Sequence, residues 1–226
     1  MSRNYWALAT DYDGTLATDG RVDEETWTAL DRLRQRDRTL ILVTGRELND
    51  LMHVCDRIDW FSWAIAENGA VLYNPAKKTI ELLCQPPPIA FVERLRAEGV
   101  TPIVVGRAIV ATWQPHGAAV QTIIDDMQLP LQMILNKRAV MVLPDNVNKA
   151  SGLAILCDRI SLDPKNIIGA GDAENDADLL RYCGWGVAVA NALPSLKQQA
   201  DWVAPRERGQ GLQDLVTWWL DAGEGN

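Results

Sequence analysis

The chain has 226 residues, of which 47% are hydrophobic, and a net charge of −8 from 30 acidic and 22 basic residues. This hydrophobic content suffices for a packed core, and the length predicts a core domain with a modest insertion. The acidic balance argues against nucleic-acid binding as the main activity, because phosphate backbones require a basic surface stripe and the sequence contains none.

The sequence also gives no sign of a membrane or secretory segment. No apolar run approaches transmembrane length, and the start of the chain lacks the apolar region of a signal peptide. We therefore predict a cytoplasmic protein without membrane contacts. The four cysteines are scattered, without a CxxC pair, and are predicted to be free thiols, mostly buried: Cys55, Cys84, Cys157 and Cys183.

Strands and helices alternate in the first half of the chain, which predicts right-handed βαβ units and a parallel sheet. A predicted hairpin then interrupts the strand–helix alternation. The stretch Gln85-Pro86-Pro87-Pro88 can continue neither a helix nor a strand, so it marks a domain boundary. The predicted elements are strands at about 6–12, 40–44 and 63–66, helices at about 23–36 and 47–58, and hairpin strands at about 70–73 and 79–83.

Residues 86–146 are predicted to form a separate small α+β unit, because the order helix–strand–strand occurs twice. Its helices are expected at about 89–98 and 117–127, and its strands at about 102–106, 108–113, 131–136 and 139–143.

Alternation resumes after this unit, so residues 1–85 and 147–226 are assigned to one α/β core with a Rossmann-like parallel sheet. The later elements are helices at about 149–160, 175–183, 194–200 and 211–221, and strands at about 166–170, 185–190 and 201–204.

Asp11 and Asp13 directly follow the first predicted strand. Two residues apart in an extended segment, they point to the same side, and Gly14 then lets the chain turn away. Both acids therefore lie at the carboxyl end of a strand, where open α/β sheets bind ligands. Like charges this close favour a hard divalent metal between them. The alternative is a simple Asp-Gly turn after a strand.

Three further stretches follow strand ends or open helices. Thr44, before Gly45, is typical of a phosphate-oxygen site, with a helix N-cap as the alternative. Lys149 opens a helix, where acids are preferred, which suggests an anionic partner, although for this residue taken alone a solvated surface lysine is the favoured explanation. The acids of 169–178 follow a strand and match an oxygen-ligand cage for magnesium, although acids are also common in first helical turns.

Together these stretches resemble the four motifs of the haloacid dehalogenase superfamily: DxDGT at 11–15, Thr44, Lys149 and GDxxND at 171–176. More specifically the chain resembles the Cof-type, class IIB-capped branch, whose cap is inserted between the third core strand and the lysine helix. Glu67-Asn68-Gly69-Ala70 is similar to a recurrent stretch of that branch. In the small size of its insertion the chain is most similar to the phosphoglycolate and sucrose-phosphate phosphatases.

The resemblance implies a Mg²⁺-dependent phosphatase that acts through an aspartyl-phosphate. Asp11 would be the nucleophile and Asp13 the general acid and base. The implied magnesium ligands are the Asp11 carboxylate, the Asp13 backbone carbonyl, Asp172 and Asp176. The implied substrate-binding residues are Thr44, Gly45, Arg46, Lys149 and Asn175.

Two alternatives remain open at this point. A phosphotransferase or phosphomutase of the same superfamily would pass the phosphoryl group to a sugar instead of water. A receiver-type signalling module uses a similar residue set, but its acid would end the third strand, where this chain has Ala66-Glu67-Asn68.

The expected partner is a small phosphorylated metabolite such as phosphoglycolate or a sugar phosphate, and the sequence indicates no oligomeric state. Four polar residues of the cap are candidates for substrate contacts, although ordinary surface exposure explains each of them more simply: Arg107, His116, Lys137 and Arg138.

Overall fold

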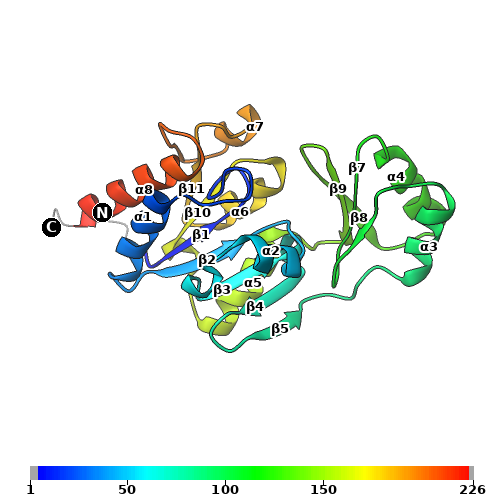
Figure 1. The fold of residues 1–226 in the computed structure, drawn as a ribbon, viewed down its shortest axis with the longest axis horizontal. Helices are drawn as coiled ribbons and strands as arrows, with labels where there is room; N and C mark the ends of the chain where they lie inside the picture. Colours follow the sequence, from blue (N-terminus) through cyan, green and yellow to red (C-terminus); the bar gives the residue numbers. More distant parts are fainter. Residues whose placement is uncertain (1–4, 224–226) are drawn as a thin grey trace.

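The computed structural model describes residues 5–223, which form two sheets at opposite ends of an elongated molecule (Figure 1). The larger sheet has eight strands in the order β12-β11-β10-β1-β2-β3-β4-β5. Its strands are β1 (Ala7–Thr10), β2 (Thr39–Val43), β3 (Trp63–Ala66), β4 (Val71–Asn74), β5 (Thr79–Leu82), β10 (Ile167–Gly171), β11 (Trp185–Ala188) and β12 (Trp202–Val203).

Six neighbouring strands of this sheet are parallel, and β4 and β5 add an antiparallel hairpin at one edge. From β1 the chain runs outward through β2 and β3, and it later returns to place β10 on the other side of β1. The order of strands thus reverses between β1 and β10, at the position where doubly wound sheets bind ligands.

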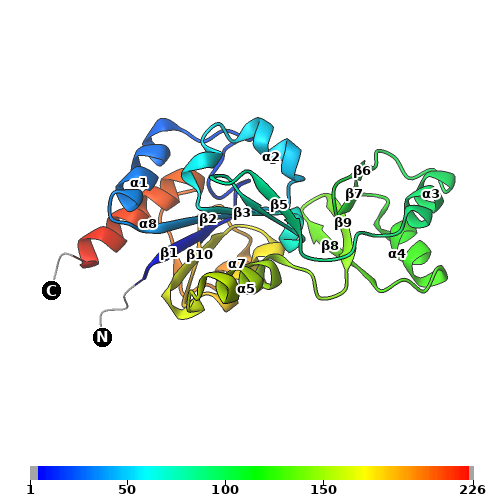
Figure 2. The same cartoon turned by 90° about the horizontal axis from the view of Figure 1, so that it is seen from below.

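Helices cover both faces of the large sheet, as the view from below shows (Figure 2). Leucines of α1 (Glu24–Arg34), α2 (Leu48–Val54) and α8 (Arg208–Gly223) share one core cluster. Leu153 and Leu156 of α5 (Lys149–Ile160) and Leu179 of α6 (Ala177–Tyr182) belong to a second cluster on the other face. Burial on both faces explains why strands such as β1 and β2 are continuous apolar runs. The short α7 (Pro194–Lys197) joins the first cluster.

The smaller sheet is antiparallel, with the order β6-β7-β9-β8, and we call residues 89–144 that form it and its helices the cap. The predicted helix–strand–strand order is confirmed, and both helices pack on one face of the sheet through a separate core cluster. The elements are α3 (Ile89–Ala97), β6 (Val104–Val105), β7 (Val110–Trp113), α4 (Gly117–Asp126), β8 (Leu131–Asn136) and β9 (Ala139–Pro144).

Strand β7 begins at Val110, two residues later than predicted, because Glu67 binds the segment before it. The buried Glu67 carboxylate accepts hydrogen bonds from the backbone N–H groups of Arg107, Ala108 and Ile109, at 3.0, 2.7 and 3.0 Å. These N–H groups therefore donate to a carboxylate of the core instead of to a neighbouring strand. The contact ties the cap to the end of β3.

All four cysteines are free, and three of them are buried, in agreement with the prediction: Cys55, Cys157 and Cys183. Across residues 5–223, no helix combines the length and apolar character needed to cross a membrane. The first four residues, which entered the argument against a signal peptide, lie outside the described range.

Gly69 lies where the end of β3 meets the start of α5. Its φ is +106°, and a Cβ built there would lie 1.9 Å from the carbonyl oxygen of Asn148. Asn148 caps α5 by accepting a hydrogen bond from the N–H of Ser151. The absence of a side chain at Gly69 therefore allows α5, and Lys149 in its first turn, to approach the large sheet.

We expect Gly69→Ala to lower the free energy of unfolding by roughly 3 kcal/mol or more, because the clash is with backbone that cannot move away cheaply. Gly99→Ala is the matched control: its φ is also positive, +76°, but a Cβ there meets nothing within 4 Å. It should cost only about 1–2 kcal/mol for the left-handed conformation. Urea unfolding followed by circular dichroism measures both, and equal losses would contradict the role given to Gly69.

Candidate active site

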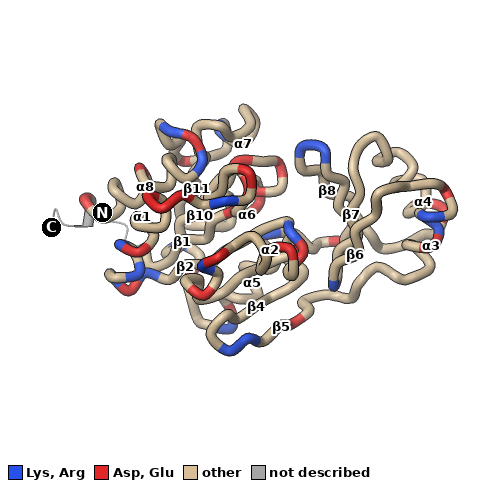
Figure 3. Tube along the Cα trace, in the orientation of Figure 1, with Lys and Arg blue, Asp and Glu red and all other residues tan. Residues whose placement is uncertain are grey.

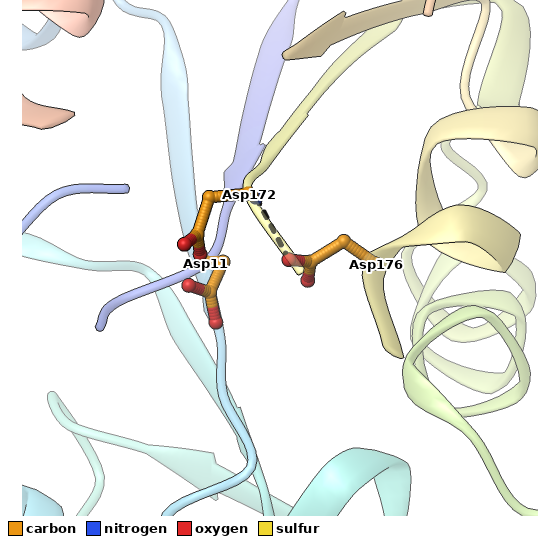
Figure 4. Close-up of side chains that lie close together, drawn as sticks. All are labelled: Asp11, Asp172 and Asp176. Carbon is orange, nitrogen blue, oxygen red and sulfur yellow. Dashed lines mark hydrogen bonds between the residues drawn. The ribbon is translucent and has the colours of Figure 1, made fainter. Parts of the chain in front are cut away.

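Three carboxylates meet at the carboxyl ends of β1 and β10 (Figure 4). Asp11 follows β1, Asp172 follows β10, and Asp176 lies one short turn further on. One oxygen of each lies within 4.8 Å of the others, and all three residues are buried. The strand reversal between β1 and β10 thus brings together acids that are about 160 residues apart in the sequence.

Backbone and side-chain contacts orient these acids. Asp176 accepts hydrogen bonds from the N–H groups of Asp172 and Ala173, at 2.9 and 3.0 Å. Because of these contacts residues 174–176 form a 3₁₀ turn, and the helix predicted to begin at about 175 begins as α6 at Ala177. Thr15 donates to Asp172 at 3.3 Å. A Cβ on Gly14 would lie 2.5 Å from an Asp172 oxygen, so only glycine fits there.

Lys149 is fully buried between two of the acids. Its Nζ donates to Asp11 at 2.5 Å and to Asp176 at 2.6 Å, so the lysine is not a solvated surface residue. Burial alone would lower the pKa of Lys149, but the carboxylates of Asp11 and Asp176 raise it above its usual range. Lys149 therefore stays charged and supplies one positive charge to the cluster.

One buried cation does not balance three buried carboxylates. Burial raises the pKa of Asp11, with Lys149 opposing the shift and Asp176 and Asp172 adding to it. Burial likewise raises the pKa of Asp172. The atoms of the cluster that could bind a metal ion are all carboxylate oxygens, the ligands that hard divalent cations prefer. The residues present therefore fit a divalent metal ion.

Asp13 lies apart from this cluster and is held by Arg46. The Nε and Nη2 of Arg46 donate to the two oxygens of Asp13 at 2.5 and 2.7 Å, and its Nη1 donates to Asp50 at 2.6 Å. The Asp13 side chain is 40% exposed, unlike the three buried acids. The structure thus separates the two predicted catalytic acids into a buried one and an accessible one.

Thr44 is not a helix N-cap, because that position before α2 is occupied by Glu47. The Thr44 Oγ accepts a hydrogen bond from the N–H of Arg46 at 3.1 Å. The hydroxyl hydrogen of Thr44 has no acceptor among the described residues. The N–H of Gly45 likewise has no acceptor among the described residues. Both face a cavity and are free to donate to a ligand.

That cavity has a volume of about 560 Å³ and lies between the large sheet and the cap. Asp11, Asp13, Thr44, Gly45 and Arg46 line its core side, and the cap strands line the other. Of the predicted site residues, the structure brings these five together around one space. Lys149, Asp172 and Asp176 lie behind Asp11, outside the lining.

Asn175, like Lys149, is a predicted substrate-binding residue that does not line this cavity. Its Nδ2 donates to Asn68 at 2.9 Å, and both residues line a second cavity of about 260 Å³ rather than the one at Asp11. Asn175 remains adjacent, since a Cβ on Gly45 would lie 3.5 Å from its Nδ2.

The cap also contributes Lys137, which the sequence offered only as a candidate for substrate contact. Lys137, in the β8–β9 turn, has a side chain that is 54% exposed, as expected for a surface residue, and it also donates to Asp172 at 2.9 Å. Basic residues at this turn and acidic residues at the strand ends are visible in Figure 3. The other cap candidates have different places: the His116 ring binds the carbonyl of Thr101, Arg107 reaches Asn49, and Arg138 is exposed.

Glu67 was also missed, although its stretch was noted for family resemblance. A glutamate that ends a buried strand is a detectable signal, because a carboxylate buried there needs several donors. Its donors come from 40 or more residues later in the chain and could not be identified from the sequence.

Known proteins resemble this chain over most of its length. The family model of the haloacid dehalogenase-like hydrolases matches residues 8–86 and 129–215. A phosphoglycolate phosphatase of Methanopyrus kandleri is 29% identical over 92% of this chain and 94% of its own length. An HMP-PP phosphatase of Citrobacter koseri is 28% identical, covering 94% and 95%.

Solved structures support the fold. A haloacid dehalogenase-like hydrolase from Bacteroides thetaiotaomicron superposes with a TM-score of 0.79 at 19% identity, over 95% of this chain and 99% of that one.

We expect Lys149→Met to lower the free energy of unfolding of the metal-free protein by about 3–5 kcal/mol, because it leaves buried carboxylates without their cation. Arg159→Met is the control: it breaks the ion pair with Glu81, in which both side chains are exposed, and should cost about 1 kcal/mol or less. Chemical denaturation in the presence of a chelator measures both. A loss for Lys149→Met as small as that of the control would show that Lys149 does not neutralise the cluster.

Proposed function

We propose that this chain, which belongs to the haloacid dehalogenase-like hydrolases and is a phosphatase of that family, hydrolyses a small phosphorylated metabolite. The reaction would proceed through an aspartyl-phosphate and require Mg²⁺. The observation that carries the proposal is the buried cluster of Asp11, Asp172, Asp176 and Lys149 beside a cavity between the core and the cap. A volume of about 560 Å³ suits a small metabolite.

Asp172, Asp176 and the Asp11 carboxylate would hold Mg²⁺, and the Asp13 backbone carbonyl remains a predicted fourth ligand. Bound there, Mg²⁺ would neutralise the carboxylates and polarise the phosphoryl group. Of the divalent cations, magnesium is proposed because it is usually held by few carboxylates together with substrate oxygens.

In the first step an Asp11 oxygen attacks phosphorus, and the bond from phosphorus to the leaving oxygen breaks as Asp13 protonates that oxygen. In the second step Asp13 accepts a proton from a water molecule, which attacks the aspartyl-phosphate and releases inorganic phosphate. In this structure Arg46 donates to both oxygens of Asp13. Asp13 would have to leave at least one of these contacts to carry the proton that it gives to the leaving oxygen.

The remaining predicted residues would hold the phosphoryl group. Thr44 and the backbone of Gly45 face the cavity with free donors. Lys149 has three N–H donors, of which two are used by Asp11 and Asp176, so one remains for a phosphoryl oxygen. Asn175 would position the adjacent Gly45 backbone rather than touch the substrate.

We also propose that residues 1–85 and 147–226 form the catalytic core, and that residues 86–146, which contain the cap, form an inserted domain that encloses the substrate. The cap strands form one wall of the cavity, and closure of such a site excludes water from the aspartyl-phosphate until hydrolysis.

The first test is phosphate release from a panel of small phosphate esters, with and without Mg²⁺. We expect release that requires Mg²⁺ and is absent in Asp11→Asn, since an amide cannot attack phosphorus. Asp214→Asn, which removes a surface carboxylate paired with Arg206, is the matched control and should keep native activity. Clear activity in Asp11→Asn would refute its role as nucleophile.

A second test concerns Asp13. We expect Asp13→Asn to lower kcat by about 10²–10⁴-fold, because proton transfer to the leaving oxygen is lost. The rise in melting temperature on adding Mg²⁺ should persist, since the Asp13 side chain lies outside the carboxylate cluster. Loss of that rise would instead assign the Asp13 carboxylate to the metal.

A further inference from the structure

We propose that the leaving group of the substrate is a flat, uncharged ring, aromatic or heteroaromatic, that packs against Trp113 of the cap. This inference rests on the proposed phosphatase function, because it concerns the part of the substrate that departs from the phosphoryl group at Asp11. It narrows the substrate to phosphate esters of ring-bearing alcohols.

The wall of the cavity opposite Asp11 is built from strands without charge. None of β6, β7, β8 and β9 contains Lys, Arg, Asp or Glu. Their side chains alternate between two faces, and one face is packed against α3 and α4: Val110, Val140 and Val142 belong to that core cluster.

The other face points into the cavity. Its residues come from three strands: Val104, Ala111, Trp113, Ala139 and Met141. Strand register places them side by side, since Val104 pairs with Ala111, Ala111 with Met141, and Trp113 with Ala139. The wall is therefore one continuous apolar surface.

Trp113 and Val104 remain 39% and 40% exposed on this wall. Large apolar side chains that line a cavity without being covered mark a ligand-binding surface. The neighbouring Ala111 and Ala139 are small, so their side chains leave room beside the indole ring. Met141, which is 4% exposed and part of the core cluster, lies beside Ala111.

The charges in the cavity disfavour an acidic leaving group. Arg46 is the one Lys or Arg among the lining residues, and Asp13 and Asp50 already bind it. Glu47 and Asp50 also line the cavity and carry negative charge. A carboxylate on the leaving group would meet repulsion without a free cation in the lining.

Asn136 adds a directional contact. It lines the same cavity, pairs with Ala139 in strand register, and its Oδ1 is buried without a hydrogen-bond partner. A buried acceptor of this kind favours a ligand that brings a donor. We therefore expect the ring to carry an N–H or O–H group.

The rival is a carboxylate-bearing leaving group bound by Lys137. That lysine lies outside the cavity lining and pairs with Asp172, but metal binding at Asp172 would release it. The experiment below separates the two.

We would measure kcat/KM with Mg²⁺ for benzyl phosphate, ethyl phosphate, cyclohexylmethyl phosphate and phosphoglycolate. The first three leaving alcohols have similar acidity, so differences report binding of the leaving group. We expect benzyl phosphate to exceed ethyl phosphate and phosphoglycolate by roughly tenfold or more, and cyclohexylmethyl phosphate to fall below it, because a flat ring stacks on indole.

Trp113→Ala should lower kcat/KM for benzyl phosphate by roughly tenfold and leave ethyl phosphate nearly unchanged, while Trp113→Phe retains most of the preference. Trp218→Ala is the matched control, since Trp218 is similarly exposed, at 42%, but lies on α8 of the core. Circular dichroism checks that each variant is folded.

Calorimetric binding of benzylphosphonate, which cannot be hydrolysed at its P–C bond, separates the inference from the proposed function. Tight binding that Trp113→Ala weakens, without release of phosphate from any ester, would support the ring site and refute the phosphatase mechanism. Two results would overturn the inference. One is a preference for phosphoglycolate that disappears in Lys137→Gln, and the other is a kcat/KM for benzyl phosphate that Trp113→Ala leaves unchanged.

Discussion

The rest of the site depends on one electrostatic constraint: three carboxylates share a buried space and must be neutralised there. Lys149 supplies one positive charge from within, and its burial is possible only because Gly69 allows α5 to approach the sheet. Gly14 removes the side chain that would displace Asp172. The remaining negative charge is reduced by Lys137, which donates to Asp172, and by protons where burial raises the pKa of Asp11 and Asp172. A divalent cation can replace both, so the site is suited to hold a metal and a phosphoryl group together.

The two sides of the cavity divide the chemistry. The core side is polar and charged, and it faces the reacting phosphorus, whereas the cap side is an apolar wall formed by strands without a charged residue. Glu67 connects the two sides by accepting three backbone hydrogen bonds from the cap. The reaction and the selectivity for the leaving group can therefore change independently. Substitutions in the cap strands would change which leaving group is preferred without changing the contacts of Asp11.

Much of this could be predicted from the sequence. Strand–helix alternation gave the core sheet, and polar residues at strand ends identified Asp11, Asp13 and Asp172, because parallel strands end at one edge. Side-chain partners could not be predicted. Lys149 reaches Asp11 across 138 positions, and Lys137 meets Asp172 only because the β8–β9 turn folds over the core. Side chains alternate along β7, so Trp113 lies on the face of the sheet opposite to that of Val110 and Thr112. Only the packing of α3 and α4 against one face decides that the other face meets the cavity.

The most direct test of the central claim is calorimetric titration of Mg²⁺ into the native protein and Asp172→Asn near neutral pH, in buffers of different ionisation enthalpy. We expect one ion per chain, release of protons because burial raises the pKa of Asp11 and Asp172, and much weaker binding in Asp172→Asn. Absence of saturable binding, or equal affinity in the two proteins, would contradict the claim that this cluster is a magnesium site.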